Sequence, residues 1–189
     1  MKKFMYLIVS VFLLIGLSTN AQDFKASTTK SELKWTGKKV TGEHWGYVNL
    51  KDGKLTLKNN KITSGEFSID MASLINKDLT DESYNQKLIG HLKSDDFFSV
   101  DKYPSVNLVI TESTVFINNE ATVNGKLTIK GITQPITFKA IKDGNVYSST
   151  ISIDRTKYDI RYGSGKFFDS LGDNMIYDDF IIDVKLVVE

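Results

Sequence analysis

Residues 125–138 read GKLTIKGITQPITF, and this stretch decides the fold. Apolar and polar side chains alternate over residues 123–130, and the alternation resumes over residues 136–140. A period of two predicts strands with one apolar and one solvated face. Residues 131–134 are predicted to form the reversal, and Pro135 lies where the next strand begins, a place that tolerates a missing N–H. The stretch therefore predicts a β-hairpin whose apolar face covers a core or a ligand.

The same alternation recurs along most of the chain. It predicts further strands at residues 33–38, 45–50, 54–58, 62–71, 106–110, 147–153 and 180–188. Asp52-Gly53 is predicted to be a hairpin turn between two of these strands, and Gly125 a bulge or bend in a curved strand. Other turns are predicted at residues 59–61, 118–119 and 143–145.

One segment departs from the period of two. Tyr84, Leu88 and Leu92 recur every four residues, which predicts a helix over residues 80–92. Thr80 or Asp81 is the expected N-cap. At least eight strands with one inserted helix and no βαβ alternation predict an all-β domain, either an antiparallel barrel or a sandwich, over residues 22–189.

The N-terminus has the pattern of a secretory signal peptide. Lys2 and Lys3 precede an apolar run over residues 4–17, and small residues follow, so cleavage is predicted after Ala21. A membrane anchor is the alternative, but the run is short for spanning a bilayer. We expect a periplasmic or secreted protein with no stable membrane span after cleavage. The chain has no cysteine, so it carries neither a disulfide nor a lipid-anchoring cysteine.

Charge and motif content argue against several function classes. Without Lys2 and Lys3, the 24 basic residues fall to 22 against 23 acidic ones, so no basic excess predicts a nucleic-acid partner. His44 and His91 are the two histidines, and they lack metal-site spacing. No nucleophile elbow is present. We predict a protein that is not an enzyme and has no metal or cofactor; a hydrolase or metal site built on His44 or His91 is the less favoured alternative.

The inward-facing side chains predicted from the alternation carry no charge. We take as candidate ligand contacts the apolar residues Trp35, Phe67, Ile69, Phe98, Leu108, Ile110, Leu127, Ile129, Phe138, Ile151, Phe180 and Ile182. If the interior is open, its cargo must be apolar, because each buried methylene contributes about 0.8 kcal/mol without any polar contact. A filled core with no ligand, serving a structural or interaction role, shows the same alternation.

Three stretches, in order, resemble the motifs of the YceI-like family. They are residues 125–133, residues 90–98 followed by Tyr103-Pro104, and residues 153–160. The resemblance implies an eight-stranded antiparallel, lipocalin-like barrel with a helix packed against it. It also implies an exported protein that holds a polyisoprenoid or similar amphiphile, such as an isoprenoid quinone, a polyprenyl chain or a fatty amide, for transport, storage or a role in envelope stress. No catalysis is established for the family.

The chain departs from the family pattern near the predicted tunnel mouth. In the family, the first strand usually leads to a histidine in a short Val-x-His context, whereas here two glycines separate Trp35 from His44. The mouth is therefore predicted to differ. Lys39, His44 and Arg155 are the candidates for polar contacts there, an apolar lipid is the expected partner, and a homodimer is a candidate assembly.

Overall fold

The structure is a computed structural model that describes residues 20–189. Residues 1–19 of the predicted signal peptide (1–21) lie outside the described residues. The strands are β1 (Gln22–Lys25), β2 (Glu32–Lys39), β3 (Gly42–Lys58), β4 (Lys61–Asn76), β5 (Ser105–Ser113), β6 (Glu120–Ile129), β7 (Ile132–Asp143), β8 (Val146–Asp154) and β9 (Ile176–Val187). The helices are α1 (Glu82–Lys93) and two 3₁₀ helices, η1 (Arg155–Tyr158) and η2 (Gly172–Asn174).

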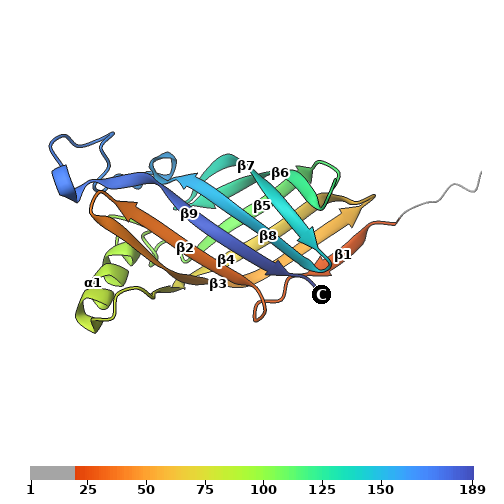
Figure 1. Cartoon of the computed structure of the whole chain (residues 1–189), viewed down its shortest axis with the longest axis horizontal. Helices are drawn as coiled ribbons and strands as arrows, with labels where there is room; N and C mark the ends of the chain where they lie inside the picture. The colour runs from red at the N-terminus through yellow and green to blue at the C-terminus, as the bar shows by residue number, and fades with distance from the viewer. Residues whose placement is uncertain (1–19) are drawn as a thin grey trace, which may run out of the picture.

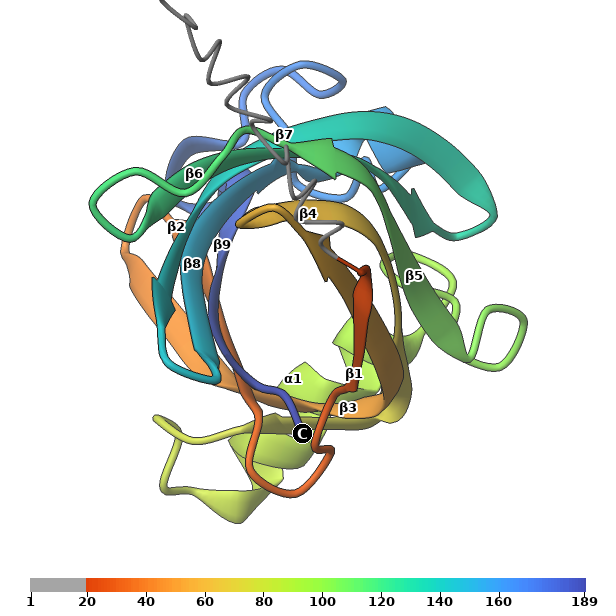
Figure 2. The ribbon, with the colours of Figure 1, turned by 90° about the vertical axis from the view of Figure 1, so that its right-hand side faces the viewer.

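Eight of the strands form a closed antiparallel barrel (Figures 1 and 2). Neighbours around the ring follow the order β3-β2-β9-β8-β7-β6-β5-β4, and β4 pairs with β3 to close it. The predicted eight-stranded antiparallel barrel with one inserted α-helix is thus confirmed. The short strand β1 stands outside the ring and pairs with the last part of β3, beyond the part that β2 reaches.

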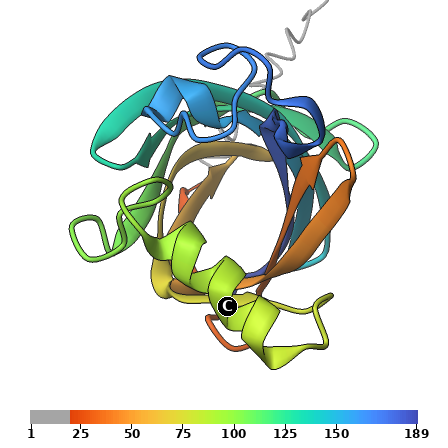
Figure 3. The same cartoon turned by 90° about the vertical axis from the view of Figure 1, so that its left-hand side faces the viewer.

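The two ends of the barrel differ. Figure 3 looks onto the end crossed by α1, where the β2–β3 and β6–β7 turns and the segment between β8 and β9 also lie. At the opposite end, β1 lies beside the C-terminus (Figure 2). The backbones of Lys25 and Glu189 exchange hydrogen bonds of 2.9 and 2.8 Å there. Ala26, Leu55 and Val188 are buried in the main core. The two ends are therefore built by different parts of the chain.

The helix α1 forms where the spacing of four predicted one. It starts at Glu82, and Asp81 is the N-cap, its side chain accepting from the Tyr84 N–H at 3.1 Å. Leu88 and Leu92 pack against the barrel core although no residue of α1 is fully buried. The helix thus rests on the rim of the barrel. Within residues 20–189, no helix combines the length and the apolarity needed to cross a bilayer.

The predicted turn at Asp52-Gly53 is wrong. β3 runs without interruption through both residues, and Gly53 pairs with Phe67 of β4. A Cβ on Gly53 would lie 2.5 Å from Cδ1 of Phe67, so this glycine makes room for a ring rather than for a reversal. The predicted turns at residues 59–61, 118–119 and 143–145 are present.

The opening hairpin is confirmed, with a tighter reversal than predicted. Lys130 and Gly131 alone form the turn, both with positive φ (50° and 74°), and Pro135 lies inside β7 opposite Lys126 rather than at its start. The predicted bulge at Gly125 falls on the partner strand instead, where the register of β5 shifts between Ile110 and Glu112.

Candidate ligand-binding cavity

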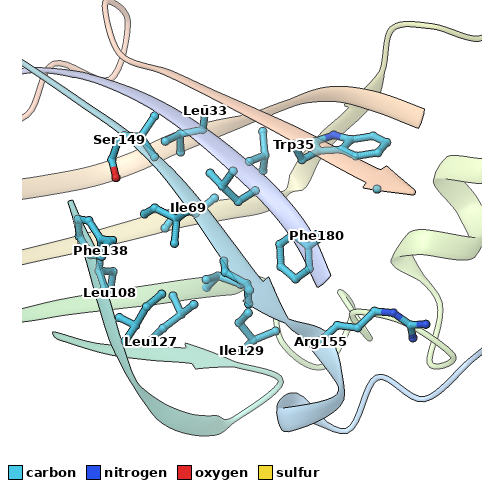
Figure 4. Close-up of a pocket in the computed structure, with 18 of the residues that line it drawn as sticks. Leu33, Trp35, Ile69, Leu108, Leu127, Ile129, Phe138, Ser149, Arg155 and Phe180 are labelled. Atoms are coloured by element: carbon cyan, nitrogen blue, oxygen red, sulfur yellow. The ribbon is translucent and has the colours of Figure 1, made fainter. Parts of the chain in front are cut away.

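The barrel encloses a cavity of about 410 Å³ that the side chains do not fill (Figure 4). Such a volume lies within the usual range of pockets for single small ligands, about 300–1,000 Å³. The structure brings together around it all twelve candidate contact residues from the sequence, namely Trp35, Phe67, Ile69, Phe98, Leu108, Ile110, Leu127, Ile129, Phe138, Ile151, Phe180 and Ile182.

The inner faces of the strands supply an apolar body to the cavity. In β4, β5 and β6, alternate residues point inward, because successive side chains of a strand face opposite sides of the sheet. Ile69, Leu108, Phe180 and Ile182 all pack on the core clusters and yet stay only partly buried. They remain accessible because they face open space inside the barrel.

The charged and imidazole groups of the lining gather at the end of the barrel that α1 crosses, whereas Tyr147, Ser148 and Ser149 line it near the β7–β8 turn. The charged and imidazole side chains of the lining are Lys38, Lys39, His44, His91, Arg155 and Asp179. They come from the end of β2, the start of β3, the end of α1, the residue after β8 and the start of β9. The cavity is therefore amphipathic, with an apolar body and one polar end, as an amphiphile requires.

His44 is oriented by a carboxylate that sequence reasoning missed. Its Nδ1 lies 2.7 Å from Oδ2 of Asp78, in the segment between β4 and α1. The other oxygen, Oδ1, accepts from the Trp45 N–H at 2.8 Å and from Nδ2 of Asn76 at 2.6 Å. Burial opposes ionisation of Asp78, but the hydrogen bonds from His44, Trp45 and Asn76 outweigh it and lower the pKa of the carboxyl.

An ionised Asp78 fixes the tautomer of the neighbouring ring. Because the carboxylate can only accept, Nδ1 of His44 donates to it, and Nε2 is left to meet a ligand group at the polar end. Lys39 lines the same end without an ion pair of 4.0 Å or less in the described residues, whereas Lys38 pairs with Glu43 at 3.3 Å. His44 and Lys39 are thus placed where a polar head group would lie.

Arg155 lines the cavity, but most of its donors are engaged elsewhere. It is 3% exposed, and it donates to the carbonyl oxygens of Tyr177 (3.1 Å), Ile160 (2.9 Å) and Ile176 (3.0 Å). Its Nη2 lies 3.8 Å from Oδ1 of Asp178. Burial lowers the pKa of the guanidinium, and the charge of Asp178 opposes that effect. Arg155, labelled in Figure 4, therefore joins the end of β8 to Ile160 and to the start of β9.

His91 packs among aromatic rings. Its ring lies 4.4 Å from that of Tyr162 and 5.1 Å from that of Phe97, and its Nε2 is 3.7 Å from Asp96. Within the described range, no group of three or more His, Asp or Glu residues could hold a metal ion.

The comparisons with known proteins agree with this architecture. The chain is 28% identical over 134 residues to a UPF0312 protein of Shewanella denitrificans, an alignment that covers 68% of this chain and spans 66% of the length of that relative.

Two solved structures share the fold. BcnA of Burkholderia cenocepacia superposes with a TM-score of 0.66 at 24% identity, over 86% of this chain and 98% of BcnA. A polyisoprenoid binding domain from Saccharophagus degradans, implicated in plant cell wall breakdown, gives a TM-score of 0.58 at 14% identity, over 88% of this chain and 97% of that domain. At these identities the likeness concerns the fold alone.

The sequence profile of the YceI-like domain matches residues 24–188, which takes in every barrel strand. The protein belongs to the YceI-like family.

Proposed function

We propose that the protein binds one long-chain amphiphile of isoprenoid type, such as an isoprenoid quinone or a polyprenyl lipid, with its chain inside the barrel. The observation that carries this proposal is the unfilled cavity of about 410 Å³ with an apolar body and a polar end. The likeness to a polyisoprenoid binding domain supports the choice of chemical class. The protein acts as a carrier or store of the lipid, without catalysis and without a further cofactor.

The energetics of such a complex rest on the chain rather than on the head group. Each methylene buried from water contributes about 0.8 kcal/mol, so a dozen buried carbons contribute about 10 kcal/mol, of the same order as the cost of association, about 4–15 kcal/mol. The head group would meet Nε2 of His44 and the ammonium of Lys39, which set the direction in which the amphiphile lies. Polar contacts at one end give orientation, and the apolar wall gives affinity.

An exported location fits a lipid carrier of this kind. The predicted signal peptide at residues 1–21 would deliver the mature chain, from Gln22 onward, to the periplasm or the medium. There the barrel would shield an apolar chain from the water between or outside the membranes.

The test is to purify the mature protein from its native host, extract it with organic solvent, and identify the extract by mass spectrometry. We expect close to one isoprenoid-type lipid per chain, and an N-terminus at Gln22 by intact mass. A second exported protein of the same host, purified in parallel, gives the background of adventitious lipid. Extracts that match this background, together with no uptake of an added isoprenoid, would refute the proposal.

A further inference from the structure

The contact between β7 and β8 is the weakest place in the barrel wall. The two strands pair only next to their turn, through Ile141↔Ser148, Lys142↔Tyr147 and Asp143↔Val146. On its other side, β7 pairs with β6 along almost its whole length, and β8 pairs with β9 throughout. Beyond the three rungs, residues 134–140 of β7 and 149–154 of β8 have no ladder between them. We call these two facing segments the β7–β8 seam (Figure 1).

The cavity reaches this seam. Ser149 of β8 and Phe138 of β7 both face the interior (Figure 4). Ser148 also lines the cavity, although it is exposed and belongs to the outer face of β8. Ser148 and Ser149 therefore place part of the lining at the point where the ladder between β7 and β8 ends.

Burial differs between the two edges of the seam. The inward residues Ile136 and Phe138 of β7 are only half-buried, whereas Ile151 and Ile153 on the β8 edge are buried. Pro135 agrees with an open edge on β7, because proline inside a strand is tolerated where the strand behaves as an edge. At this level β7 has a partner on one side only.

Two side-chain hydrogen bonds, rather than a ladder, bridge the seam. Oγ of Ser149 donates to the Lys139 carbonyl at 2.7 Å near the turn. At the α1 end, Nε2 of Gln134 donates to the Lys157 carbonyl at 3.3 Å. Between these two points the inward side of the seam is apolar, formed by the side chains of Ile136, Phe138, Ile151 and Ile153. The outward residues Thr137, Thr150 and Ser152 are polar and exposed.

We propose that the β7–β8 seam is a lateral portal, through which the hydrocarbon chain of the bound amphiphile enters and leaves the barrel sideways. This inference rests on the proposed function. End-on entry would drag the whole chain past the charged groups at the polar end, including Lys39, His44 and Asp179. A slit along the strands admits the chain over its length and keeps it against the apolar inward side chains of both strands. Carbons in excess of the cavity volume can then project through the same slit.

A disulfide across the seam tests the portal, since the chain has no cysteine of its own. Continuing the register of the three rungs sets Thr137 against Ser152, both exposed and outside the lining, so the test variant is Thr137→Cys/Ser152→Cys. The matched control is Val109→Cys/Lys126→Cys, which staples β5 to β6 where they already pair. The probe is all-trans-retinol, a fluorescent isoprenoid alcohol, and its release into phosphatidylcholine vesicles is followed in oxidised and reduced protein.

We expect oxidation to slow retinol release about tenfold or more in the seam variant, because the low-barrier route is closed. Reductant should restore the original rate, and the β5–β6 control should be indifferent to oxidation. Equal rates in the oxidised and reduced seam variant would overturn the portal while leaving the proposed function in place. Absence of retinol binding by every form, the unaltered protein included, would instead contradict the proposed function.

Hydrogen exchange on the unaltered protein decides the question if the variant does not fold or oxidise. The β7 amides of residues 134–140 that do not donate to β6 should exchange much faster than the amides between β5 and β6. Equal protection of the two sets would show a closed seam and overturn the inference.

Discussion

Arg155 shows how one buried cation can organise an irregular segment. The segment between β8 and β9 has few ladder bonds of its own. The guanidinium donates to the Ile160 carbonyl of this segment and to the carbonyls of Ile176 and Tyr177 at the start of β9. Asp178 lies beside it, and its Oδ1 has no hydrogen-bond partner within the described residues. The charge of Arg155 therefore balances a carboxylate that the backbone does not satisfy.

Replacing Arg155 by methionine removes this balance and leaves the three carbonyl groups without a donor. We expect Arg155→Met to lower the free energy of unfolding by about 3–5 kcal/mol, the usual cost of breaking a buried charge pair. Urea denaturation measures the change. The matched control is Arg161→Met, because Arg161 pairs with Asp159 at 2.6 Å on an exposed surface, where ion pairs contribute about 0–1 kcal/mol. Similar losses in the two variants would contradict the anchoring role of Arg155.

The His44–Asp78 pair gives the polar end of the cavity a dependence on pH. Because folding lowers the pKa of Asp78, its contribution to stability is fully present above the ordinary value of 3.8 and is lost as the pH falls through the lower pKa of the folded state. In Asp78→Asn this contribution is absent at every pH. The difference in unfolding free energy between the two proteins should thus be largest at neutral pH and shrink below about pH 4.

Urea unfolding curves recorded between about pH 7 and about pH 3 would measure that difference. A difference that stays constant over the whole range would show that Asp78 does not act through its charge.

Gly46 and Gly53 of β3 lie where a backbone or a ring comes close, whereas a Cβ on Gly37 of β2 would meet no atom within 4 Å. A Cβ on Gly46 of β3 would lie 1.9 Å from the carbonyl oxygen of Ile75 in β4. Gly90 of α1 is the opposite case, since a Cβ there would meet no atom within 4 Å. The same residue type is therefore required in one element and merely tolerated in another.

Alanine at these two positions should shift stability in opposite directions. Gly46→Ala forces β3 and β4 apart and should cost about 1–3 kcal/mol or more, in the manner of an overpacked core. Gly90→Ala should stabilise α1 by up to about 1 kcal/mol, because alanine is the better helix former. Thermal denaturation of the two variants against the parent measures both. A loss in Gly90→Ala, or no loss in Gly46→Ala, would count against the packing described for these elements.

The elements also show what the sequence could predict. The alternation of the strand residues identified the barrel wall and the side chains that face inward. In a strand, successive side chains point to opposite sides of the sheet, so once one residue is inward the direction of every other residue follows. It could not separate the glycine of a turn from the glycine of a close contact, so Asp52-Gly53 was wrongly assigned. Strand β1, with only four residues, is too short to show a period.

Other features of the site depend on contacts between distant parts of the chain. Asp78 lies 34 positions from His44, and no local pattern joins the two. The β7–β8 seam is likewise invisible in sequence, since both strands alternate normally and only their divergence opens the wall. Pro135 is the one local signal of this open edge, although its position in the sequence predicts only the start of a strand.

For the whole molecule, the central question is whether the open interior takes up an apolar chain. The barrel could have filled its interior with side chains, and the sequence alone left that alternative standing. The structure leaves about 410 Å³ open, with the charged groups confined to one end. If that volume is the binding site, filling it must abolish binding without unfolding the barrel.

The most direct test is a fluorescence titration of all-trans-retinol into the parent protein, Leu108→Trp and Val109→Trp. Leu108 lines the cavity, whereas its neighbour Val109 points outward from β5 and is 44% exposed, so the two variants add the same ring on opposite faces of one strand. The account predicts one retinol bound per parent chain, the same for Val109→Trp, and a loss of at least about tenfold in affinity, or 1.4 kcal/mol, for Leu108→Trp with its thermal stability kept. Equal affinities of the two variants, or no binding by the parent, would contradict the claim that the barrel interior holds the lipid.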